Sequence, residues 1–367
     1  MFTFTTIVAA VILTTVVTAT NTTTTTTDWT KITATNTTTT TTDWTKITPG
    51  GPTLCSKGAP FSFYYRKGSV NKLVVELQGG GACWNSNTCA LGTFTTTCSP
   101  PGSTGVHSST DSRNPFQDWN HLFIPYCTAD AHGGNQTTEY SSIFGKFKIH
   151  HFGRVNAFAA MDYAFALPEN TNPTTVSTIG CSAGSLGAIV NVPYVNAQYP
   201  SSKHMYFGDS YVGVISNQQF GDGIANWDLQ FSPNVPGLDK ANLERVAANK
   251  SIDAGLYIVN ATITSAPDDC QFASYTSNDD AVQSSFYTLG GGIDWPNHMR
   301  HLTETIHSIH GDQYSTYIAP GFKHCRTQDD GVYDVVSDKI KLSDWMTNFV
   351  NGKIEHRQVD CKVSNNC

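Results

Sequence analysis

The sequence has few charged residues and no dense cluster of basic ones. Only 14% of its 367 residues are Asp, Glu, Lys or Arg, and 22 basic residues against 29 acidic ones give a formal net charge of −7. Binding to nucleic acid needs concentrated positive charge. The composition therefore excludes nucleic acid as a partner and favours a neutral or apolar ligand.

The ten cysteines include no C-x-x-C pair, so the sequence offers no zinc ribbon and no thioredoxin-like redox site. Two histidine pairs, His298/His301 and His307/His310, have helical spacing, but no carboxylate or cysteine pattern accompanies them. We interpret them as a solvated helix face and predict neither a metal nor an organic cofactor. Ten cysteines behind an apolar N-terminus instead favour an oxidising compartment and up to five structural disulfides. Their connectivity cannot be read from spacing.

Long apolar runs are also absent, except at the N-terminus. Residues 2–19 (FTFTTIVAAVILTTVVTA) end in Val17-Thr18-Ala19, a plausible cleavage site. We predict a signal peptide over 1–19, with an uncleaved anchor as the alternative, and hence a secreted, extracellular protein. No later segment is long and apolar enough to span a membrane, so no stable span is expected after cleavage.

A threonine-rich duplication follows the apolar run. The 15 residues ATNTTTTTTDWTKIT at 19–33 recur without change at 34–48. Six consecutive threonines cannot bury a core, so we predict a disordered linker over 20–43 and a folded domain over 44–367. Five N-x-S/T acceptors predict some glycosylation: Asn21, Asn36, Asn135, Asn249 and Asn260.

The folded domain alternates between strand-like and helix-like segments. Runs of β-branched and aromatic residues predict strands at 61–66, 72–78, 121–127, 174–179, 203–208, 271–275 and 313–319. Helical spacing of apolar residues predicts helices at 154–167, 185–197, 297–310 and 336–350. Pro193 is expected to kink or end the second helix near Val192. The alternation predicts an α/β fold with a mostly parallel sheet, helices on both faces, and catalytic groups at the carboxyl ends of the strands.

One strand-to-helix junction carries a G-x-S-x-G pattern. Residues 179–190 read IGCSAGSLGAIV, with Ser182 between Gly180 and Gly184. A serine nucleophile in this setting needs small neighbours, because the strand end and the helix start crowd together. The pattern alone is weak in a chain rich in Ser and Gly. With a strand-like run before it and a helix-like run after it, we interpret Ser182 as a nucleophile.

A glycine-rich loop follows an early strand. The stretch 76–84 reads ELQGGGACW. Glycines let backbone N–H groups point into a site, and this fold class builds half of its oxyanion hole in such a loop. Ala183, the residue after Ser182, would supply the other half. The alternative interpretation is a simple tight turn.

A serine nucleophile also needs a base and an acid that orients the base. His324, in a loop after a late strand, lies in the right part of the chain for the base, although twelve histidines compete. The acid is expected between Ser182 and His324. Four carboxylates qualify: Asp268, Asp269, Asp279 and Asp280. Asp279 and Asp280 follow a strand-like run, and spacing alone leaves the choice between them open.

Taken together, these segments resemble the pectin acetylesterase/Notum family of α/β-hydrolase-fold carboxylesterases. The resemblance rests on ordered motifs: LQGGGACW with Cys89, IPYCTAD at 124–130, GCSAGS around Ser182, GDSYVG at 208–213, an Asp-x-x-Gln starting at Asp280, and His324-Cys325. It implies Ser182 as nucleophile, His324 as base and Asp280 as acid. It also implies an oxyanion hole formed by the N–H groups of Gly81, Ala82 and Ala183. Ala82 departs from the Trp of many members, and Ser185 from a second Gly.

The resemblance implies ester hydrolysis through an acyl-enzyme, on acetyl groups of a cell-wall polysaccharide or another ester substrate. One alternative is a Notum-like deacylase of longer acyl chains on protein or lipid. Another is a non-catalytic, glycosylated surface binding protein on a hydrolase scaffold, although the joint presence of three triad residues argues against it. Cys181 and Cys325 adjoin Ser182 and His324, and we predict disulfides at both, with Cys270 as the partner of Cys325. The alternative is a free buried thiol.

Overall fold

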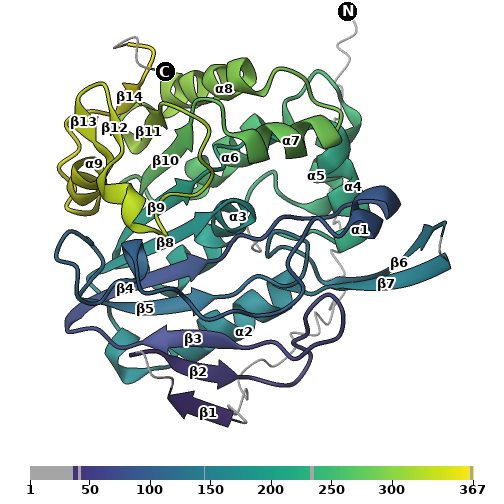
Figure 1. The fold of residues 1–367 in the computed structure, drawn as a ribbon, viewed down its shortest axis with the longest axis horizontal. Coiled ribbons are helices and arrows are strands. Elements are labelled where there is room, and N and C mark those ends of the chain that lie inside the picture. Colours follow the sequence, from purple (N-terminus) through teal and green to yellow (C-terminus); the bar gives the residue numbers. More distant parts are fainter. Residues whose placement is uncertain (1–35, 40–42, 144, 232–234, 364–366) are drawn as a thin grey trace, which may run out of the picture. The chain divides into compact units, whose positions relative to one another are not determined.

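A ten-stranded sheet forms the centre of the fold (Figure 1). The computed structural model describes residues 36–39, 43–143, 145–231, 235–363 and 367, which fall in one unit, Ile32–Cys367. The strands lie in the order β1 (Asn36–Thr39), β2 (Thr45–Thr48), β3 (Phe63–Arg66), β5 (Trp119–Ile124), β4 (Val70–Leu77), β8 (Thr175–Cys181), β9 (Lys203–Asp209), β10 (Gln271–Ser277), β11 (Tyr314–Ala319) and β14 (Gln358–Asp360). From β5 to β14 all neighbours are parallel, whereas β1, β2, β3 and β5 pair antiparallel.

Helices cover both faces of this sheet. Within the described residues they are α1 (Ser86–Leu91), α2 (Gly153–Phe165), α3 (Ala183–Gln198), α4 (Asn217–Trp227), α5 (Lys240–Ala248), α6 (Ala254–Ser265), α7 (Ala281–Leu289), α8 (Trp295–His310) and α9 (Leu342–Val350). Along β4, Leu73 and Val75 join the cluster that contains α2, α3, α6 and α8, whereas Val74 joins the cluster of α9. Alternate side chains of a strand point to opposite faces. The predicted α/β architecture is therefore confirmed.

Two small hairpins lie outside the main sheet in the described part of the chain. β6 (Gln136–Ser142) pairs with β7 (Gly145–His151), and β12 (Val336–Ser337) pairs with β13 (Ile340–Lys341). The second hairpin occupies the start of the segment that we predicted as the last helix. Asp338 and Lys339 have positive φ values of 46° and 65°, which suits a tight hairpin turn and not a helix. The last helix accordingly begins only at Leu342.

We expected Pro193 either to kink α3 or to end it near Val192, and the second of these alternatives is wrong. The helix continues through Pro193 to Gln198. Pro193 removes one backbone hydrogen bond, but Val192 and Val195 are buried against the neighbouring core on either side of it. Burying each such side chain contributes about 1.5–3 kcal/mol, which offsets the lost bond.

The N-terminal predictions are only partly within the described residues. The predicted signal peptide lies outside them, and so does most of the linker. Residues 36–39, which we expected to be disordered, instead form β1 by pairing with β2. Threonine is a good strand former, so the repeat can extend a sheet edge although it cannot build a core. Among the described residues, no helix is long and apolar enough to cross a membrane.

Four disulfides are present among the described cysteines: Cys55–Cys127, Cys83–Cys89, Cys181–Cys325 and Cys361–Cys367. The predicted pairing of Cys325 with Cys270 is wrong, because Cys325 pairs with Cys181 and Cys270 is a buried free thiol. Cys270 immediately precedes β10, whereas Cys181 ends β8. In a parallel sheet these two positions lie at opposite ends of the strands. The loop that holds Cys325 follows the carboxyl end of β11, and it is therefore on the side of Cys181.

Candidate active site

Ser182 occupies the turn between β8 and α3 in a strained conformation. Its φ of 57° and ψ of −127° lie in a region that few residues other than glycine adopt. The flanking glycines are sterically required. A Cβ on Gly180 would lie 2.2 Å from the carbonyl oxygen of Gly184, and a Cβ on Gly184 would lie 2.0 Å from that of Leu77. The expectation that only small residues fit beside Ser182 therefore agrees with the local geometry.

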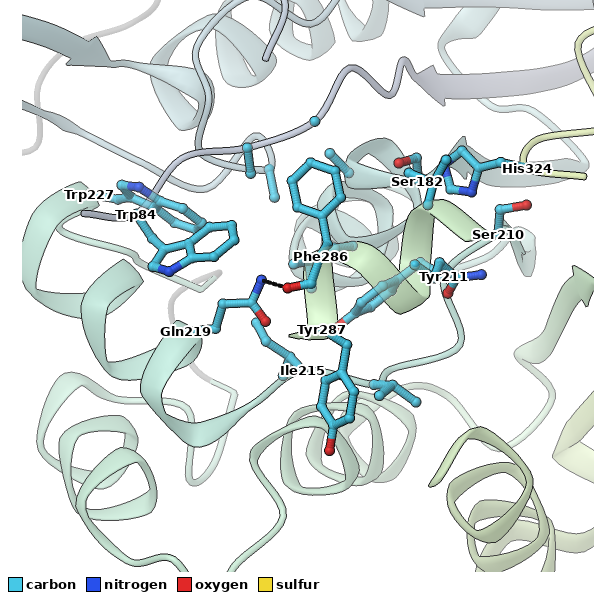
Figure 2. Close-up of a pocket in the computed structure, with 18 residues that line it drawn as sticks. Trp84, Ser182, Ser210, Tyr211, Ile215, Gln219, Trp227, Phe286, Tyr287 and His324 are labelled. Carbon is cyan, nitrogen blue, oxygen red and sulfur yellow. Dashed lines mark hydrogen bonds between the residues drawn. The ribbon is translucent and has the colours of Figure 1, made fainter. Parts of the chain in front are cut away.

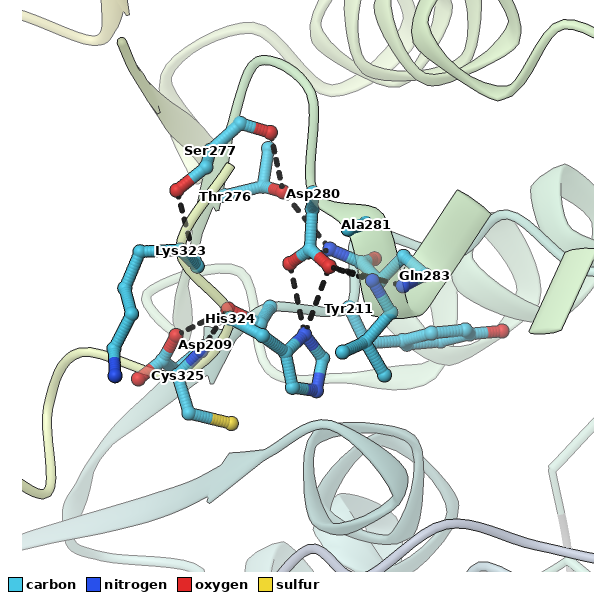
Figure 3. Close-up of polar contacts among 12 residues, drawn as sticks. Asp209, Tyr211, Thr276, Ser277, Asp280, Ala281, Gln283, Lys323, His324 and Cys325 are labelled. Atoms are coloured by element: carbon cyan, nitrogen blue, oxygen red, sulfur yellow. Dashed lines mark hydrogen bonds and ion pairs between the residues drawn. The ribbon is translucent and has the colours of Figure 1, made fainter. Parts of the chain in front are cut away.

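His324 is paired with Asp280 (Figure 3). The ring nitrogen Nδ1 lies 2.8 Å from Oδ2 and 2.9 Å from Oδ1 of the carboxylate. Asp280 is fully buried, whereas the His324 side chain is 17% exposed. The carboxylate also accepts hydrogen bonds from the backbone N–H groups of Val282 and Gln283 as the N-cap of α7, and from Gln283 Nε2 at 2.9 Å. This donor set holds Asp280 in one orientation toward the imidazole.

The structure separates the adjacent carboxylates that spacing left open. Asp279 is exposed, and its side chain accepts a hydrogen bond from Asn278, not from His324. Asp280 ends the loop after β10 and begins α7, which turns its carboxylate inward. The preference for Asp280 over Asp279 came from the family resemblance and not from spacing. The packing of α7 supplies the physical reason for that preference.

Asp209 and Ser210 connect the serine turn to the histidine loop, a role that sequence reasoning missed. The backbone N–H of Ser182 donates to the carbonyl of Asp209 at 2.8 Å. The buried Asp209 Oδ2 accepts from the backbone N–H groups of Arg326 and Thr327. Ser210 Oγ accepts from the backbone N–H of Cys325 at 2.8 Å. The only available signal was the GDSYVG segment, which gives no indication of these partners.

The Cys181–Cys325 disulfide reinforces the same connection. Its two cysteines directly adjoin Ser182 and His324 in sequence, and their Cα atoms are 5.8 Å apart. The His324 ring nitrogen and the two sulfurs lie within 4.8 Å of one another. Sulfurs that are bonded to each other cannot serve as thiolate ligands, so this cluster does not suit a metal. The disulfide therefore acts as a cross-link between the two loops.

The glycine-rich loop lies on the other side of Ser182. Gly81 has a φ of 78°, and a Cβ there would lie 1.9 Å from the carbonyl oxygen of Thr93. Gly81, Ala82 and Ala183 all line the same cavity as Ser182 and His324. The three predicted oxyanion residues are thus brought to one site.

The cavity measures about 660 Å³ including space open to solvent, and most of its wall is apolar. Figure 2 shows Ser182 and His324 at one side, the indole rings of Trp84 and Trp227 at the other, and the Phe286 ring between them. Trp84 belongs to the glycine-rich loop motif found in the sequence, but the rest of the apolar wall of the cavity was not predicted. It is contributed by α3, α4, α7 and the segment before α4: Leu186, Val214, Ile215, Trp227, Val282 and Phe286.

Ser185, one of the two departures from the family pattern, is buried beneath this cavity. Its hydroxyl lies 2.9 Å from Tyr206 Oη and donates to the carbonyl of Tyr211 at 3.1 Å. Tyr211 lines the cavity next to Ser210. The hydroxyl therefore helps to fix the turn that supports the histidine loop, which explains how a serine is accommodated there.

Comparison with known proteins identifies the family. Residues 33–214 match the family model described as pectinacetylesterase, a range that includes Ser182 and ends before Asp280. The chain belongs to the pectin acetylesterase/Notum family.

Two curated relatives illustrate this family. Palmitoleoyl-protein carboxylesterase NOTUM of Schmidtea mediterranea is 28% identical over 153 residues, covering 38% of this chain and 27% of that protein. Pectin acetylesterase 4 of Arabidopsis thaliana is 27% identical over 160 residues, covering 40% of this chain and 37% of that protein. The matches thus span well under half the length of these relatives. The crystal structure of the Wnt deacylase Notum from Drosophila superposes with a TM-score of 0.62 at 16% identity, covering 84% of this chain and 92% of that one, which establishes a shared fold.

Proposed function

We propose that the protein is a secreted serine carboxylesterase, with Ser182 as nucleophile, His324 as base and Asp280 as orienting acid. The observation that carries this proposal is the paired His324 and Asp280 beside a cavity that also contains the strained Ser182. A serine in a strand-to-helix turn, a histidine and a buried carboxylate are the parts that acyl transfer requires. Membership in a family of carboxylesterases supports the same reaction class.

The reaction proceeds in two halves. His324 takes the proton of Ser182 while the hydroxyl oxygen attacks the ester carbonyl, and the N–H groups of Gly81, Ala82 and Ala183 stabilise the oxyanion. His324 then protonates the leaving alcohol, which leaves an acyl group on Ser182. Water attacks this acyl-enzyme by the same route. Asp280, with no contact to solvent, keeps Nδ1 of His324 as the donor so that Nε2 is free to accept the proton.

The acyl group is expected to occupy the cavity beside Ser182. Acetyl esters of a polysaccharide are the first candidate substrates, because the relatives include pectin acetylesterases. The apolar lining of the cavity favours a second candidate, esters of longer acyl chains. A further cavity lined only by apolar side chains adjoins the first and shares with it Ala131, Leu186, Ile215 and Trp227. An acetyl group alone would leave most of this apolar wall unused.

A fluorophosphonate probe tests the nucleophile. We expect it to label the wild-type protein at Ser182 and not to label Ser182→Ala, while Ser308→Ala, which changes an exposed serine, labels normally. Asp280→Asn should lower kcat by about 10⁴-fold by analogy with other triads, whereas Asp279→Asn should change it little. Labelling that persists in Ser182→Ala, or equal losses in the two Asp variants, would refute the assignment. No labelling of the wild type would favour the binding-protein alternative.

A series of p-nitrophenyl esters separates the two substrate classes. If acyl chains longer than acetyl are preferred, kcat/KM should rise from acetyl to octanoyl. Ile215→Trp should then lower the octanoyl value at least tenfold, about 1.4 kcal/mol, with little effect on acetyl. A steep fall in wild-type activity beyond acetyl would instead favour a polysaccharide acetylesterase.

Secretion is supported by the predicted signal peptide and by the four disulfides, which form and persist in oxidising compartments. Among the N-glycosylation acceptors, Asn135 and Asn249 are exposed, whereas Asn260 lies in α6 and its side chain accepts a hydrogen bond from His310. We expect glycans on the first two. N-terminal sequencing of protein recovered from the culture medium should find a start after Ala19, and protein retained in the membrane fraction would favour the anchor.

A further inference from the structure

Three cysteines come together behind the glycine-rich loop, although only two of them are bonded to each other. Cys55 and Cys127 form a disulfide, and Cys98 is a free, half-buried thiol. The sulfur of Cys98 lies 3.6 Å from that of Cys55 and 3.7 Å from that of Cys127. A free thiol in contact with both sulfurs of a disulfide can exchange with it.

Cys98 ends a short segment, residues 93–98, that we call the strap. The strap lies along the glycine-rich loop: the backbone N–H of Thr95 donates to the carbonyl of Gly80 at 2.8 Å, and Thr93 Oγ1 donates to that of Ala82 at 2.8 Å. Phe94 forms an isolated β-bridge with Gly81. The backbone that carries two of the proposed oxyanion donors is therefore supported directly by the strap.

The opposite side of the same loop is supported by the segment that contains Cys127. The backbone N–H of Tyr126 donates to the side chain of Gln78, and that of Cys83 donates to the carbonyl of Ala129. A Cβ on Gly80 would lie 2.0 Å from Thr95 Oγ1 and 2.8 Å from the Tyr126 ring. The loop is thus clamped between the strap and the segment 126–129. The three sulfurs lie where these two supports meet.

We propose that Cys55, Cys98 and Cys127 form a thiol–disulfide exchange site, in which Cys98 displaces one partner of the Cys55–Cys127 disulfide and ties the strap covalently to the body of the protein. The Cys98 thiolate supplies the electron pair of the new S–S bond, the old S–S bond breaks, and the displaced sulfur leaves as a thiolate that takes up a proton. One disulfide and one thiol are present before and after, so no oxidant or reductant is consumed. Because Cys98 is almost equidistant from both sulfurs, it lies beside the S–S bond and must first rotate into line with that bond. Rotation toward either sulfur leads to a displacement whose product anchors the strap.

The exchange is expected to accelerate as the pH rises. Burial raises the pKa of the Cys98 thiol, partly offset by the hydrogen bond that its sulfur accepts from the backbone N–H of Ser62. Only the thiolate attacks a disulfide, so the reactive form is scarce at neutral pH. The strap is consequently expected to be free in most molecules at low pH and to become anchored in a growing fraction on incubation at pH 9.

Peptide mapping of the full-length protein tests the exchange without any activity measurement. Samples held at pH 6 or pH 9 without added thiol are quenched in acid, alkylated with N-ethylmaleimide and mapped under non-reducing conditions. We expect Cys98 to be joined to Cys55 or Cys127 in a fraction that increases at pH 9 and does not depend on protein concentration. In Cys98→Ser, Cys55 should be joined to Cys127 alone. Complete alkylation of Cys98 at both pH values would overturn the proposal.

Two variants fix the strap in each of its anchored forms. Cys55→Ser should contain Cys98–Cys127, and Cys127→Ser should contain Cys55–Cys98, so a folding defect in one still leaves the other. If both variants fold with Cys98 and its expected partner alkylated, the proposal fails. Hydrogen exchange at the Thr95 amide should be at least about threefold slower in either variant than in Cys98→Ser. Equal rates would show that anchoring does not stabilise the strap.

The consequence for catalysis rests on the proposed function. If Gly81 and Ala82 are oxyanion donors, anchoring the strap should change kcat at least about twofold with little change in KM, because the donors act in the transition state. A Cys55→Ser variant that the fluorophosphonate probe labels, but whose kcat equals that of the wild type, would overturn this consequence. A protein with no esterase activity at all would refute the proposed function and leave the mapping result standing.

Discussion

Removing the Cys181–Cys325 disulfide is the most informative perturbation of this protein, because it affects stability and the site together. The bond closes a loop with a sequence separation of 144 residues, and the Cys361–Cys367 bond closes one of only 6. In the chain-entropy model, the loss on removal is 298 K times 2.1 + 1.5R ln n cal/mol/K. This gives about 5 kcal/mol for the long loop and about 2 kcal/mol for the short one.

The two double variants, Cys181→Ala/Cys325→Ala and Cys361→Ala/Cys367→Ala, form a matched pair. Guanidinium denaturation followed by tryptophan fluorescence should show a loss of unfolding free energy larger by about 3 kcal/mol in the first. Because its cysteines adjoin Ser182 and His324, the first variant should also lose ester hydrolysis at temperatures where it is still folded. Equal destabilisation of the two variants, with full activity in the first, would refute the argument that this bond couples the two loops.

Three further predictions concern the polar contacts around the site and the buried core. Gln283→Leu removes an amide that donates to both Asp280 and Thr276, and since a hydrogen bond to a charged group is worth about 1.5–3 kcal/mol, kcat should fall about 10- to 100-fold with KM nearly unchanged. Asp209→Asn places an amide donor against the N–H groups of residues 326 and 327, and should destabilise the protein by about 2 kcal/mol in thermal unfolding. The third is acid destabilisation. Burial lowers the pKa of three histidines to about 4: His121, His132 and His151. Their folded forms resist protonation, so stability should be lost as the pH falls from about 6.5 to about 4. Burial raises the pKa of Asp130 to about 6, which has the opposite sign, and the net loss should be about 2 kcal/mol per pH unit near pH 5.

Each of these predictions has a contradicting outcome. A Gln283→Leu variant with wild-type kcat would show that Asp280 does not need this donor. Unchanged unfolding of Asp209→Asn would show that the carboxylate does not hold the histidine loop. Stability that is flat between pH 6.5 and 4 in denaturant titrations would show that the buried histidines do not titrate as their burial implies.

Residues that act through local geometry could be predicted from sequence. The turn around Ser182 is specified within five residues, because the strand before it, the helix after it and the glycines on either side are contiguous in the chain. The glycine-rich loop is equally local. The same holds for most strands, since β-branched runs such as residues 174–179 encode their own extended conformation. The resemblance to a known family then linked these segments to His324 and Asp280, which spacing alone left among several candidates.

Features that depend on contacts between distant segments were missed or predicted wrongly. The predicted partner of Cys325 was wrong, because the pairing depends on whether each cysteine lies at the amino or the carboxyl ends of the strands. The strand at residues 36–39 was missed, because its stability comes from pairing with β2 and not from its composition. The apolar wall formed by Ile215, Trp227 and Phe286 was also missed, because α4 and α7 are distant in the sequence and meet only in the folded structure.

Adjacent residues specify the class of the fold, the serine turn and the loop opposite it, because the steric requirements of a turn and the periodicity of strands and helices are local properties of the chain. Contacts between distant segments determine which carboxylate faces His324, which cysteine cross-links the histidine loop, and which side chains form the cavity. These depend on how the sheet brings residues 44 to 144 positions apart into contact. Contacts at such separations are fixed by packing and topology, which no local pattern encodes.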